Sequence, residues 1–488
     1  MTGGVAEGWR WTPADLDRVG AMVMGLLRDY LTGLADRPVW QPVPGELRDG
    51  WATEPPPTSG SPAEEILKRF SAQVSPYPFG NGHPRFFAWV NSPPQVLAVF
   101  AEALAAAMNP SVAGGDHAAS HLERQVIRWF AELAGLPDGA GGLLTSGGSA
   151  ATLTALAAAR HTAAATAGID IRAAGVGGAT RRMVVYASSE AHSCVRKAVE
   201  LLGLGHDNIR TVDVDDGFRL RADHLGQLLA ADRAEGHLPV AVVASAGTVN
   251  TGAIDPIERI AEVCAAHQVW LHIDGAYGSP AVLLLDEYAD TRRALSRADS
   301  IAADPHKWLY IPVDAGMLLL RRPAAARDAF SLVPPYLRTG DDPGGVWFSE
   351  YGFDQTRPFR ALKIWMALQH LGLDGYRDLI RHDLYLARHL RQAVDAAADL
   401  EELASGLSVT CLRYHPADWD GTPAQLDQLN TSIVTAVQRS GQAFIAGTTV
   451  AGHAAIRVCI VNPGATPDDI DVLAATVLEQ GARLRSLR

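Results

Sequence analysis

Residues 300–309 read SIAADPHKWL and place Lys307 beside a histidine, two residues after a proline and between apolar residues. The apolar run 269–273 (VWLHI) lies upstream and is followed by the carboxylate of Asp274. A buried lysine can lose its charge through desolvation and then attack a carbonyl carbon. A carboxylate at the end of a strand can hold a proton on a ring nitrogen. By residue type alone, a surface lysine whose stem covers apolar neighbours is the more ordinary interpretation, so the surrounding sequence has to decide.

Short apolar runs alternate with helical stretches between residues 180 and 320. The expected strands are 183–186, 209–212, 240–244, 269–273 and 316–320, and the helical stretches include 191–202, 222–233 and 256–267. This alternation predicts a mainly parallel α/β sheet. Ligands of such sheets bind beyond the carboxyl ends of the strands. We therefore expect the polar, small and aromatic residues that follow the strands to meet at one edge of the sheet.

The segment 141–149 (GGLLTSGGS) runs directly into a strong helix former at 150–156. A glycine and serine turn that opens a helix leaves free N–H groups at the positive end of the helix dipole, which can hold a phosphate. Many ordinary links in α/β proteins look the same. Together with Lys307 and Asp274, however, the turn completes the set of residues that a pyridoxal-phosphate site requires.

The composition narrows the class of protein. A chain of 488 residues is too long for one small core and predicts two or three domains. Its formal net charge of -12 argues against nucleic-acid partners and anionic membrane surfaces. We find no signal-peptide pattern and no apolar stretch of membrane-spanning length, and the cysteines lack metal-ligand spacing. We therefore expect a cytoplasmic protein that binds no membrane, nucleic acid or metal.

The two ends of the chain differ from its centre. Residues 13–35 carry apolar positions at helical spacing, and a proline-rich connector follows at 37–62. Such an arm cannot build a core alone, so it should pack on the large domain or on a second subunit. We predict an N-terminal helical arm and crossing segment at 1–85, a large cofactor-binding domain at 86–372, and a small α+β C-terminal domain at 373–488.

These signals follow one another in the order found in the group II pyridoxal-phosphate-dependent amino-acid decarboxylases, the family of aromatic-L-amino-acid decarboxylase, which the chain resembles up to about residue 380. The matching pieces are PRFFA at 84–88, LTSGGS at 144–149, AHS at 191–193, GT at 247–248, WLHIDGAY at 270–277, DPHKW at 304–308 and RPFRALK at 357–363. The resemblance implies fold type I with a mainly parallel sheet of the seven-stranded type. It also implies pyridoxal 5'-phosphate as cofactor and a homodimer with the active site at the subunit interface.

The resemblance further assigns roles to single residues. Lys307 would bind the cofactor covalently, Asp274 would keep its ring nitrogen protonated, and His192 would stack on the ring and position the substrate or a proton. The other cofactor contacts that it implies are Gly148, Ser149, Thr248, Ala276, Ser300 and His306.

We expect the substrate's side chain to be recognised near an aromatic loop and near residues 112–117. The candidate contacts in and beside that loop are His83, Phe87, Trp89 and Ser92. Phe87 and Trp89 suit an aromatic or branched apolar side chain, although they could equally be core residues. Asp116 and His117 could instead recognise a polar or cationic group, and Arg457 is a further possible contact.

A mobile loop decides the product in this family. It presents a tyrosine from the partner subunit that protonates the carbanion after carbon dioxide leaves. Tyr351 is our candidate for this residue and Tyr336 the second choice. If neither is in place, oxygen can intercept the carbanion, and the product becomes an aldehyde.

The leading interpretation is a pyridoxal-phosphate-dependent carboxy-lyase that converts an L-amino acid, of the tryptophan, tyrosine, phenylalanine or DOPA type, into the amine and carbon dioxide. The alternatives are decarboxylation-coupled oxidative deamination, transamination, or a branched aliphatic or polar substrate. A catalytically inactive α/β binding protein is an alternative from another class. The presence of both Lys307 and Asp274 argues against it.

Overall fold

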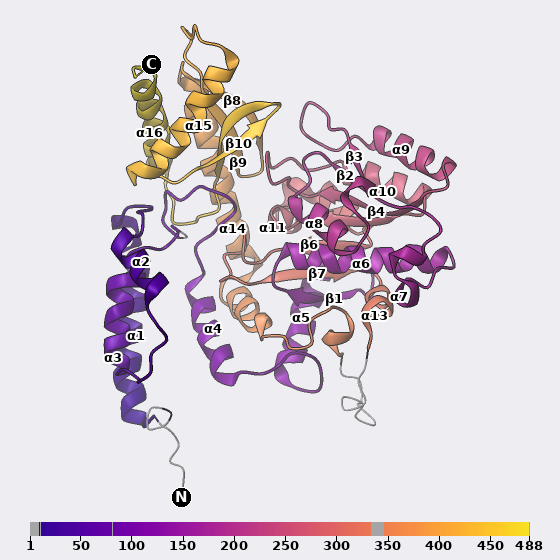
Figure 1. Ribbon diagram of the computed structural model, residues 1–488, viewed down its shortest axis with the longest axis horizontal. Helices are drawn as coiled ribbons and strands as arrows, with labels where there is room; N and C mark the ends of the chain where they lie inside the picture. Colours follow the sequence, from indigo (N-terminus) through magenta and orange to yellow (C-terminus); the bar gives the residue numbers. More distant parts are fainter. Residues whose placement is uncertain (1–8, 10, 81, 333–345, 488) are drawn as a thin grey trace, which may run out of the picture.

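The computed structural model describes residues 9, 11–80, 82–332 and 346–487, and its largest unit is a seven-stranded sheet with the order β1-β7-β6-β5-β4-β2-β3 (Figure 1). The strands are β1 (Gly141–Thr145), β2 (Met183–Ser188), β3 (Ile209–Val212), β4 (Leu238–Ser245), β5 (Trp270–Asp274), β6 (Ser300–Ala303) and β7 (Gly316–Leu320). Neighbouring strands are parallel except β7, which is antiparallel to β6 and to β1. The expected mainly parallel sheet is confirmed.

Two strands of this sheet were not expected from the sequence. β1 is rich in glycine and lies in the segment that we assigned to a turn, and β6 is a run of four residues with a single β-branched side chain. Both have weak intrinsic strand propensity. Their pairing with β7 and burial under helices place them in the sheet instead.

Helices cover the sheet and bury its strands, of which β2 and β4 are buried along their whole length. This is why these strands read as continuous apolar runs. The helices that follow the strands or precede β1 are α4 (Val96–Met108), α5 (Ala118–Leu133), α6 (Gly148–Thr166), α7 (Ile171–Ala174), α8 (Ser193–Leu201), α9 (Ala222–Ala234), α10 (Ile257–Ala266), α11 (Ser279–Leu284), α12 (Ala289–Leu295) and α13 (Ala324–Phe330).

A second, four-stranded antiparallel sheet with the order β10-β11-β9-β8 lies beside the large one (Figure 1). Its elements are β8 (Leu400–Gly406), β9 (Val409–Tyr414), α15 (Pro423–Ser440), β10 (Ala446–Val450), β11 (His453–Cys459) and α16 (Pro467–Arg485). The helix α14 (Arg360–Ala396) leads into it and loses helical geometry at Gly372, where φ is 64°. Our last domain boundary falls at this break, and the division into domains remains a prediction.

The N-terminal arm consists of α1 (Pro13–Thr32), α2 (Gly45–Thr53) and α3 (Ala63–Arg69), which lie to one side of the rest of the chain (Figure 1). α1 begins with a capping box between Thr12 and Asp15 and has a proline in its first turn. Several of the arm's apolar side chains are exposed, including Leu16, Ile66 and Phe70. Within the described residues, no helix combines the length and apolar character needed to cross a membrane.

Candidate active site

A cavity of about 380 Å³ opens at the carboxyl ends of the central strands. Its lining comes from the last residues of β4 and β5, from the segments that follow β1, β2, β4, β5 and β6, and from Val90 ahead of α4. Seven of the residues proposed from the sequence share it: Gly148, Ser149, His192, Asp274, Ala276, His306 and Lys307. Residues far apart in the chain are thus brought together at the edge of the sheet where parallel α/β proteins bind ligands.

The glycine turn after β1 forms one wall of the cavity. A Cβ atom on Gly148 would lie 2.9 Å from Ala276 Cβ and 3.0 Å from Asp304 Oδ2, so this position accepts no side chain without movement of its neighbours. Gly147 precedes the 19-residue helix α6 and provides no side-chain cap for its first N–H groups. An anionic group would be stabilised by these N–H groups and the helix dipole. The turn therefore fits the phosphate of pyridoxal phosphate.

Lys307 lies in the connection between β6 and β7. Its Nζ atom is 3.0 Å from Asp304 Oδ2, and its backbone carbonyl accepts a hydrogen bond from the hydroxyl of Ser92. Burial disfavours the ammonium form of Lys307, but the charges of Asp304 and Asp274 outweigh it and raise the pKa above its ordinary value. The expected loss of charge by desolvation is therefore wrong for the protein without ligand, because the amine has carboxylate neighbours.

Asp274 ends β5 and is buried, and its Oδ1 accepts the N–H of Ala276 at 3.1 Å. His192 precedes α8, and its Nδ1 accepts the N–H of Cys194 at 3.2 Å. Burial, partly opposed by the charge of Asp274, lowers the pKa of His192. The neutral ring, with Nδ1 occupied as an acceptor, then carries its proton on Nε2. The cavity thus offers an amine, a carboxylate and a neutral imidazole donor, which fits a pyridine aldehyde phosphate.

The residues next to Lys307 anchor its loop. His306 Nδ1 lies 2.8 Å from the carbonyl oxygen of Ala315, just before β7, and burial lowers its pKa. Trp308 Nε1 and the Tyr310 hydroxyl both donate to Oδ2 of Asp383 on α14, at 2.8 and 2.7 Å. Burial raises the pKa of Asp383 to about 7. The segment around Lys307 is thus anchored by hydrogen bonds of residues that precede and follow the lysine.

Two proposed cofactor contacts do not line the cavity. Ser300 begins β6 and is fully buried, where its hydroxyl oxygen accepts the indole N–H of Trp270 at 2.8 Å. The cavity lies at the opposite end of that short strand. Thr248 is also buried, and its hydroxyl lies 3.0 Å from that of Thr251 within the loop after β4. Neither residue is among those that line the cavity, and their contact with the cofactor remains a prediction.

The proposed substrate contacts also lie outside the cavity lining. Phe87 is fully buried in the core under the small sheet, where its N–H donates to Phe444 O. His83 is buried and lies 3.1 Å from the carbonyl oxygen of Arg37. Trp89 is 44% exposed and stacks on Phe79 at a centroid distance of 5.0 Å. Phe87 thus belongs to a hydrophobic core, Trp89 is part-exposed, and their role as substrate contacts remains a prediction.

Tyr351, the first candidate for the proton donor, does not line this cavity. Tyr351 follows the short helix η8 (Phe348–Glu350) and lines a different cavity together with Gly141 and Gly142 of β1. Tyr336 lies outside the described residues. Asp116 and His117 contact His121 and Ser120, respectively, rather than the cavity.

Ten further residues line the cavity that were not proposed as site residues: Val90, Ser146, Gly147, Ala150, Cys194, Ser245, Gly247, Val249, Tyr277 and Asp304. Each stands within three residues of a motif that we had noted, so proximity to the motifs was the available signal. Arg457 reaches across from β11 and donates from Nε to Val249 O at 2.9 Å and from Nη1 to Trp89 O at 2.9 Å. Its buried Nη2 has no hydrogen-bond partner in the part of the chain that is described.

The RPFRALK motif is structural. Each of its basic residues pairs with a carboxylate of another segment: Arg357 with Glu123, Arg360 with Asp314, and Lys363 with Glu102. The first pair is fully buried, at 1% exposure on each side. Asp314 belongs to the connection between Lys307 and β7, so the second pair anchors the far end of the lysine loop to α14.

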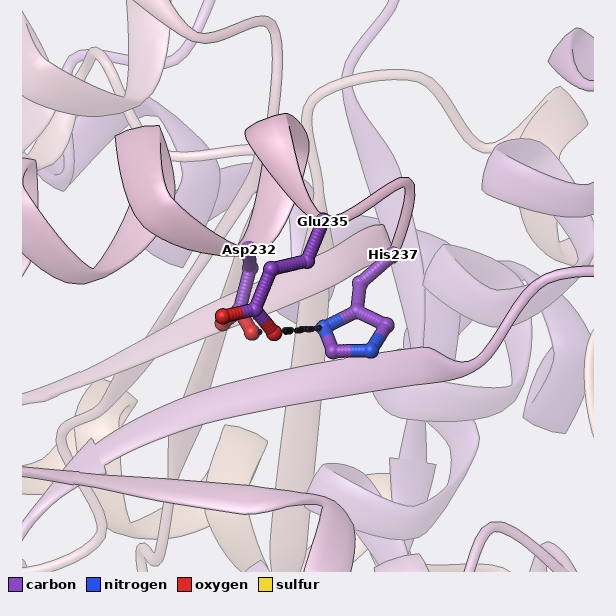
Figure 2. A group of neighbouring side chains, drawn as sticks. All are labelled: Asp232, Glu235 and His237. Atoms are coloured by element: carbon purple, nitrogen blue, oxygen red, sulfur yellow. Dashed lines mark hydrogen bonds and ion pairs between the residues drawn. The ribbon is translucent and has the colours of Figure 1, made fainter.

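A second group of titratable side chains, Asp232, Glu235 and His237, lies between the end of α9 and the start of β4 (Figure 2). His237 Nδ1 is 2.8 Å from Asp232 Oδ1 and 3.6 Å from Glu235 Oε2. Burial opposes ionisation of Asp232, but hydrogen bonds from Arg210, Tyr186 and His237 hold its pKa at about 2. These contacts tie α9 to β2 and β3, at the opposite end of β4 from the cavity.

Most of the chain is similar to known proteins. Residues 44–414 match the family model described as the pyridoxal-dependent decarboxylase conserved domain. The chain is 31% identical over 471 residues to an aromatic-L-amino-acid decarboxylase of Bacillus atrophaeus, covering 96% of this chain and 95% of that protein. It is 32% identical over 443 residues to an L-2,4-diaminobutyrate decarboxylase of Rhizobium meliloti (strain 1021), covering 89% and 85%.

Solved structures agree as well. Oryza sativa TDC, crystallised with PLP and tryptamine, superposes with a TM-score of 0.88 at 26% identity and covers 97% of this chain and 100% of that one. Mouse CSAD, at 24% identity, shares the fold with a TM-score of 0.89 and covers 96% and 99%. The expected fold type I is confirmed, the cofactor is pyridoxal phosphate, and the chain belongs to the pyridoxal-dependent decarboxylase family of amino-acid carboxy-lyases.

Proposed function

We propose that this decarboxylase acts on an aromatic L-amino acid and releases the amine and carbon dioxide, with Lys307, Asp274 and His192 as its catalytic residues. The observation that carries the assignment of these residues is their convergence on one cavity with the glycine turn at Gly148. Perturbed titratable groups that gather in a cleft at strand ends are typical of an active site.

Pyridoxal phosphate, when bound, withdraws electrons from the bond between Cα and the carboxylate, so that carbon dioxide can leave. Lys307 would supply the amine that binds the cofactor, and Asp274 would hold a proton on its ring nitrogen. Gly148, Ser149 and His306 hold the phosphate. His192 donates from Nε2 to the bound substrate, which the neutral ring found here supports.

The apolar part of the cavity supports an aromatic substrate. Val90, Val249 and Tyr277 line it. Aliphatic side chains and one aromatic side chain in the lining would favour a flat apolar ring, and aromatic contacts are worth about 0.5–1.5 kcal/mol beyond area burial. The similarity to the Bacillus atrophaeus enzyme points the same way.

A diamino acid is the second candidate, and Asp304 is the observation that favours it. Its Oδ1 atom is buried and has no hydrogen-bond partner among the described residues, although Oδ2 pairs with Lys307. A second carboxylate in the cavity would stabilise a cationic side chain. The Rhizobium meliloti relative, named for 2,4-diaminobutyrate, supports this alternative.

We also propose that the enzyme is a homodimer and that a tyrosine of the partner subunit delivers the proton to Cα. Tyr351 remains the first candidate, and it would have to act in the other subunit, because in its own chain it lines a different cavity. The exposed apolar side chains of the arm, such as Leu16 and Ile66, support a covering second copy. Light scattering of the purified protein tests the dimer.

One experiment tests the catalytic assignment. Wild-type protein should show the visible band of lysine-bound pyridoxal phosphate, which borohydride fixes on Lys307; Lys307→Ala should lose the band, and Lys197→Ala on the exposed face of α8 should keep it. A panel of aromatic and diamino acids, assayed separately for carbon dioxide, amine and peroxide, identifies the substrate and the product. A band retained in Lys307→Ala would overturn the site, and turnover restricted to diamino acids would replace the aromatic proposal.

A further inference from the structure

A line of buried polar side chains runs behind Asp274. It begins on the face of β5 that carries Trp270, His272 and Asp274, because alternate residues of a strand share one face. The indole N–H of Trp270 donates to Ser300 Oγ at 2.8 Å, and Ser300 Oγ lies 2.8 Å from Nδ1 of His272. Ser300 stands opposite His272 in the register of β5 and β6.

The line continues through two helices that pack on the same face. Nε2 of His272 is 3.3 Å from Oγ1 of Thr152 on α6, and that oxygen is 3.9 Å from Sγ of Cys194 on α8. Cys194 Sγ lies 4.0 Å from Oδ2 of Asp274. Sulfur contacts of this length are weak hydrogen bonds, whereas the other links are ordinary ones. We call this group of six residues the Asp274 relay: Trp270, Ser300, His272, Thr152, Cys194 and Asp274.

The two ends of the relay give its hydrogen bonds a direction. An indole N–H can only donate, and a carboxylate can only accept. Burial lowers the pKa of His272 to about 4, so its ring is neutral at pH 7 and has one proton to give. Ser300, Thr152 and Cys194 also have one proton each. From Trp270 to Thr152 every proton points along the line, which places the proton of His272 on Nε2. Thr152 Oγ1 also accepts from the thiol of Cys194, which is the donor to Asp274 Oδ2 as well, so the hydroxyl of Thr152 holds the thiol between the two oxygens.

We propose that the Asp274 relay orients and electrostatically supports the carboxylate that faces the cofactor's ring nitrogen, so that Thr152, His272 and Cys194 are positioning residues for pyridoxal phosphate. This inference rests on the role given above to Asp274. Removing a relay donor takes away the support of Oδ2, leaves Oδ1 with the N–H of Ala276, and weakens the hold of Asp274 on the ring nitrogen. Residues that support a metal ligand from behind change metal affinity or activity by about 10- to 100-fold. Because the sulfur link is long and therefore weak, we expect a smaller effect on cofactor affinity here, roughly three- to tenfold.

The test compares two buried hydroxyls of the same helix. Thr152→Val removes a relay hydroxyl and keeps the side chain's shape, whereas Thr154→Val removes a hydroxyl that donates to Ala150 O at 2.8 Å outside the relay. We expect Thr152→Val to raise the dissociation constant for pyridoxal phosphate three- to tenfold and to lower kcat without changing KM for the amino acid. Thr154→Val should match the wild type. Equal affinities of the two variants would overturn the proposal.

Cysteine variants and NMR provide independent measurements. Cys194→Ala should weaken cofactor binding as Thr152→Val does, and Cys194→Ser, which restores a donor, should rescue it. Nitrogen-15 spectra of histidine-labelled protein, assigned with His272→Gln, should show the His272 proton on Nε2. A proton on Nδ1, or a serine variant no better than the alanine variant, would refute the relay.

Asp274→Asn separates this inference from the proposed function. If Asp274→Asn loosens the cofactor and Thr152→Val does not, the relay fails and the function stands. If Asp274→Asn binds pyridoxal phosphate like the wild type, the role of Asp274 fails, and the relay fails with it.

Discussion

Replacing Arg357 with methionine should destabilise the protein by leaving a charge buried without a counter-ion. Arg357 Nη2 lies 2.5 Å from Glu123 Oε1 and 2.5 Å from Leu144 O, and Nη1 donates to Val112 O at 2.8 Å. Both charged side chains are 1% exposed. Breaking a buried ion pair by removing one partner costs about 3–5 kcal/mol, and we expect the free energy of unfolding to fall by an amount in this range.

The same geometry suggests a compensating change. In the double variant Arg357→Met with Glu123→Gln, the buried charge is gone, and the glutamine oxygen can still accept the N–H of Leu144, which now bonds Glu123 at 2.9 Å. The double variant should therefore recover at least about half of the lost stability, because hydrophobic replacement of a buried pair is often nearly neutral.

Equilibrium urea unfolding of the cofactor-loaded protein, followed by tryptophan fluorescence and circular dichroism, measures these differences. A loss below about 1 kcal/mol for Arg357→Met, the value of an exposed pair, would refute the reasoning. So would a double variant that is less stable than the single one, since the penalty would then not come from the unpaired charge of Glu123.

Three further predictions concern the site and its surroundings. Gly148→Ala should weaken pyridoxal-phosphate binding at least tenfold, measured by fluorescence titration, because the new Cβ would lie 2.9 Å from that of Ala276; unchanged affinity would contradict the close-packed turn. Of Tyr351→Phe and Tyr336→Phe, the variant that removes the proton donor should divert the product from amine to aldehyde and peroxide, and if neither does, the donor lies elsewhere. Burial raises the pKa of Asp383 to about 7, so the folded state holds a proton that the unfolded state, with a pKa near 3.8, releases. This contribution to stability is present below pH 4 and is lost as the pH rises to about 7, and thermal melts of Asp383→Asn should show a flatter dependence on pH in that window.

The sequence predicted the sheet and the convergence of its strand-end residues because both follow from short-range patterns. A parallel α/β alternation brings residues after successive strands to one edge, which is how Lys307, Asp274 and His192 come to share a cavity. The sequence did not predict where along its strand a given residue lies. Ser300 stands at the start of β6, and nothing in its local pattern shows which end of a four-residue strand it occupies.

The aromatic loop shows a second limit of sequence reasoning. Phe87 pairs through its backbone with Phe444, more than 350 residues later in the chain, and is buried under the small sheet. A local run of aromatic residues reads the same whether it lines a pocket or fills a core. The charge of Lys307 shows a third limit, because its carboxylate neighbours outweigh the burial that motivated the prediction.

The strand order has a consequence for synthesis of the chain. β1, which leads into the cofactor turn, is an edge strand whose neighbour is β7, and Gly316 of β7 packs directly on Gly147. At about 5–20 residues per second, the ribosome adds β7 roughly 10–35 seconds after β1. During that interval β1 exposes unpaired backbone groups that favour misassembly with other chains. A nascent chain that ends after the glycine turn but before residue 320 contains the whole turn and lacks β7, which packs against it. Pyridoxal phosphate can therefore stabilise the site only after β7 has been synthesised.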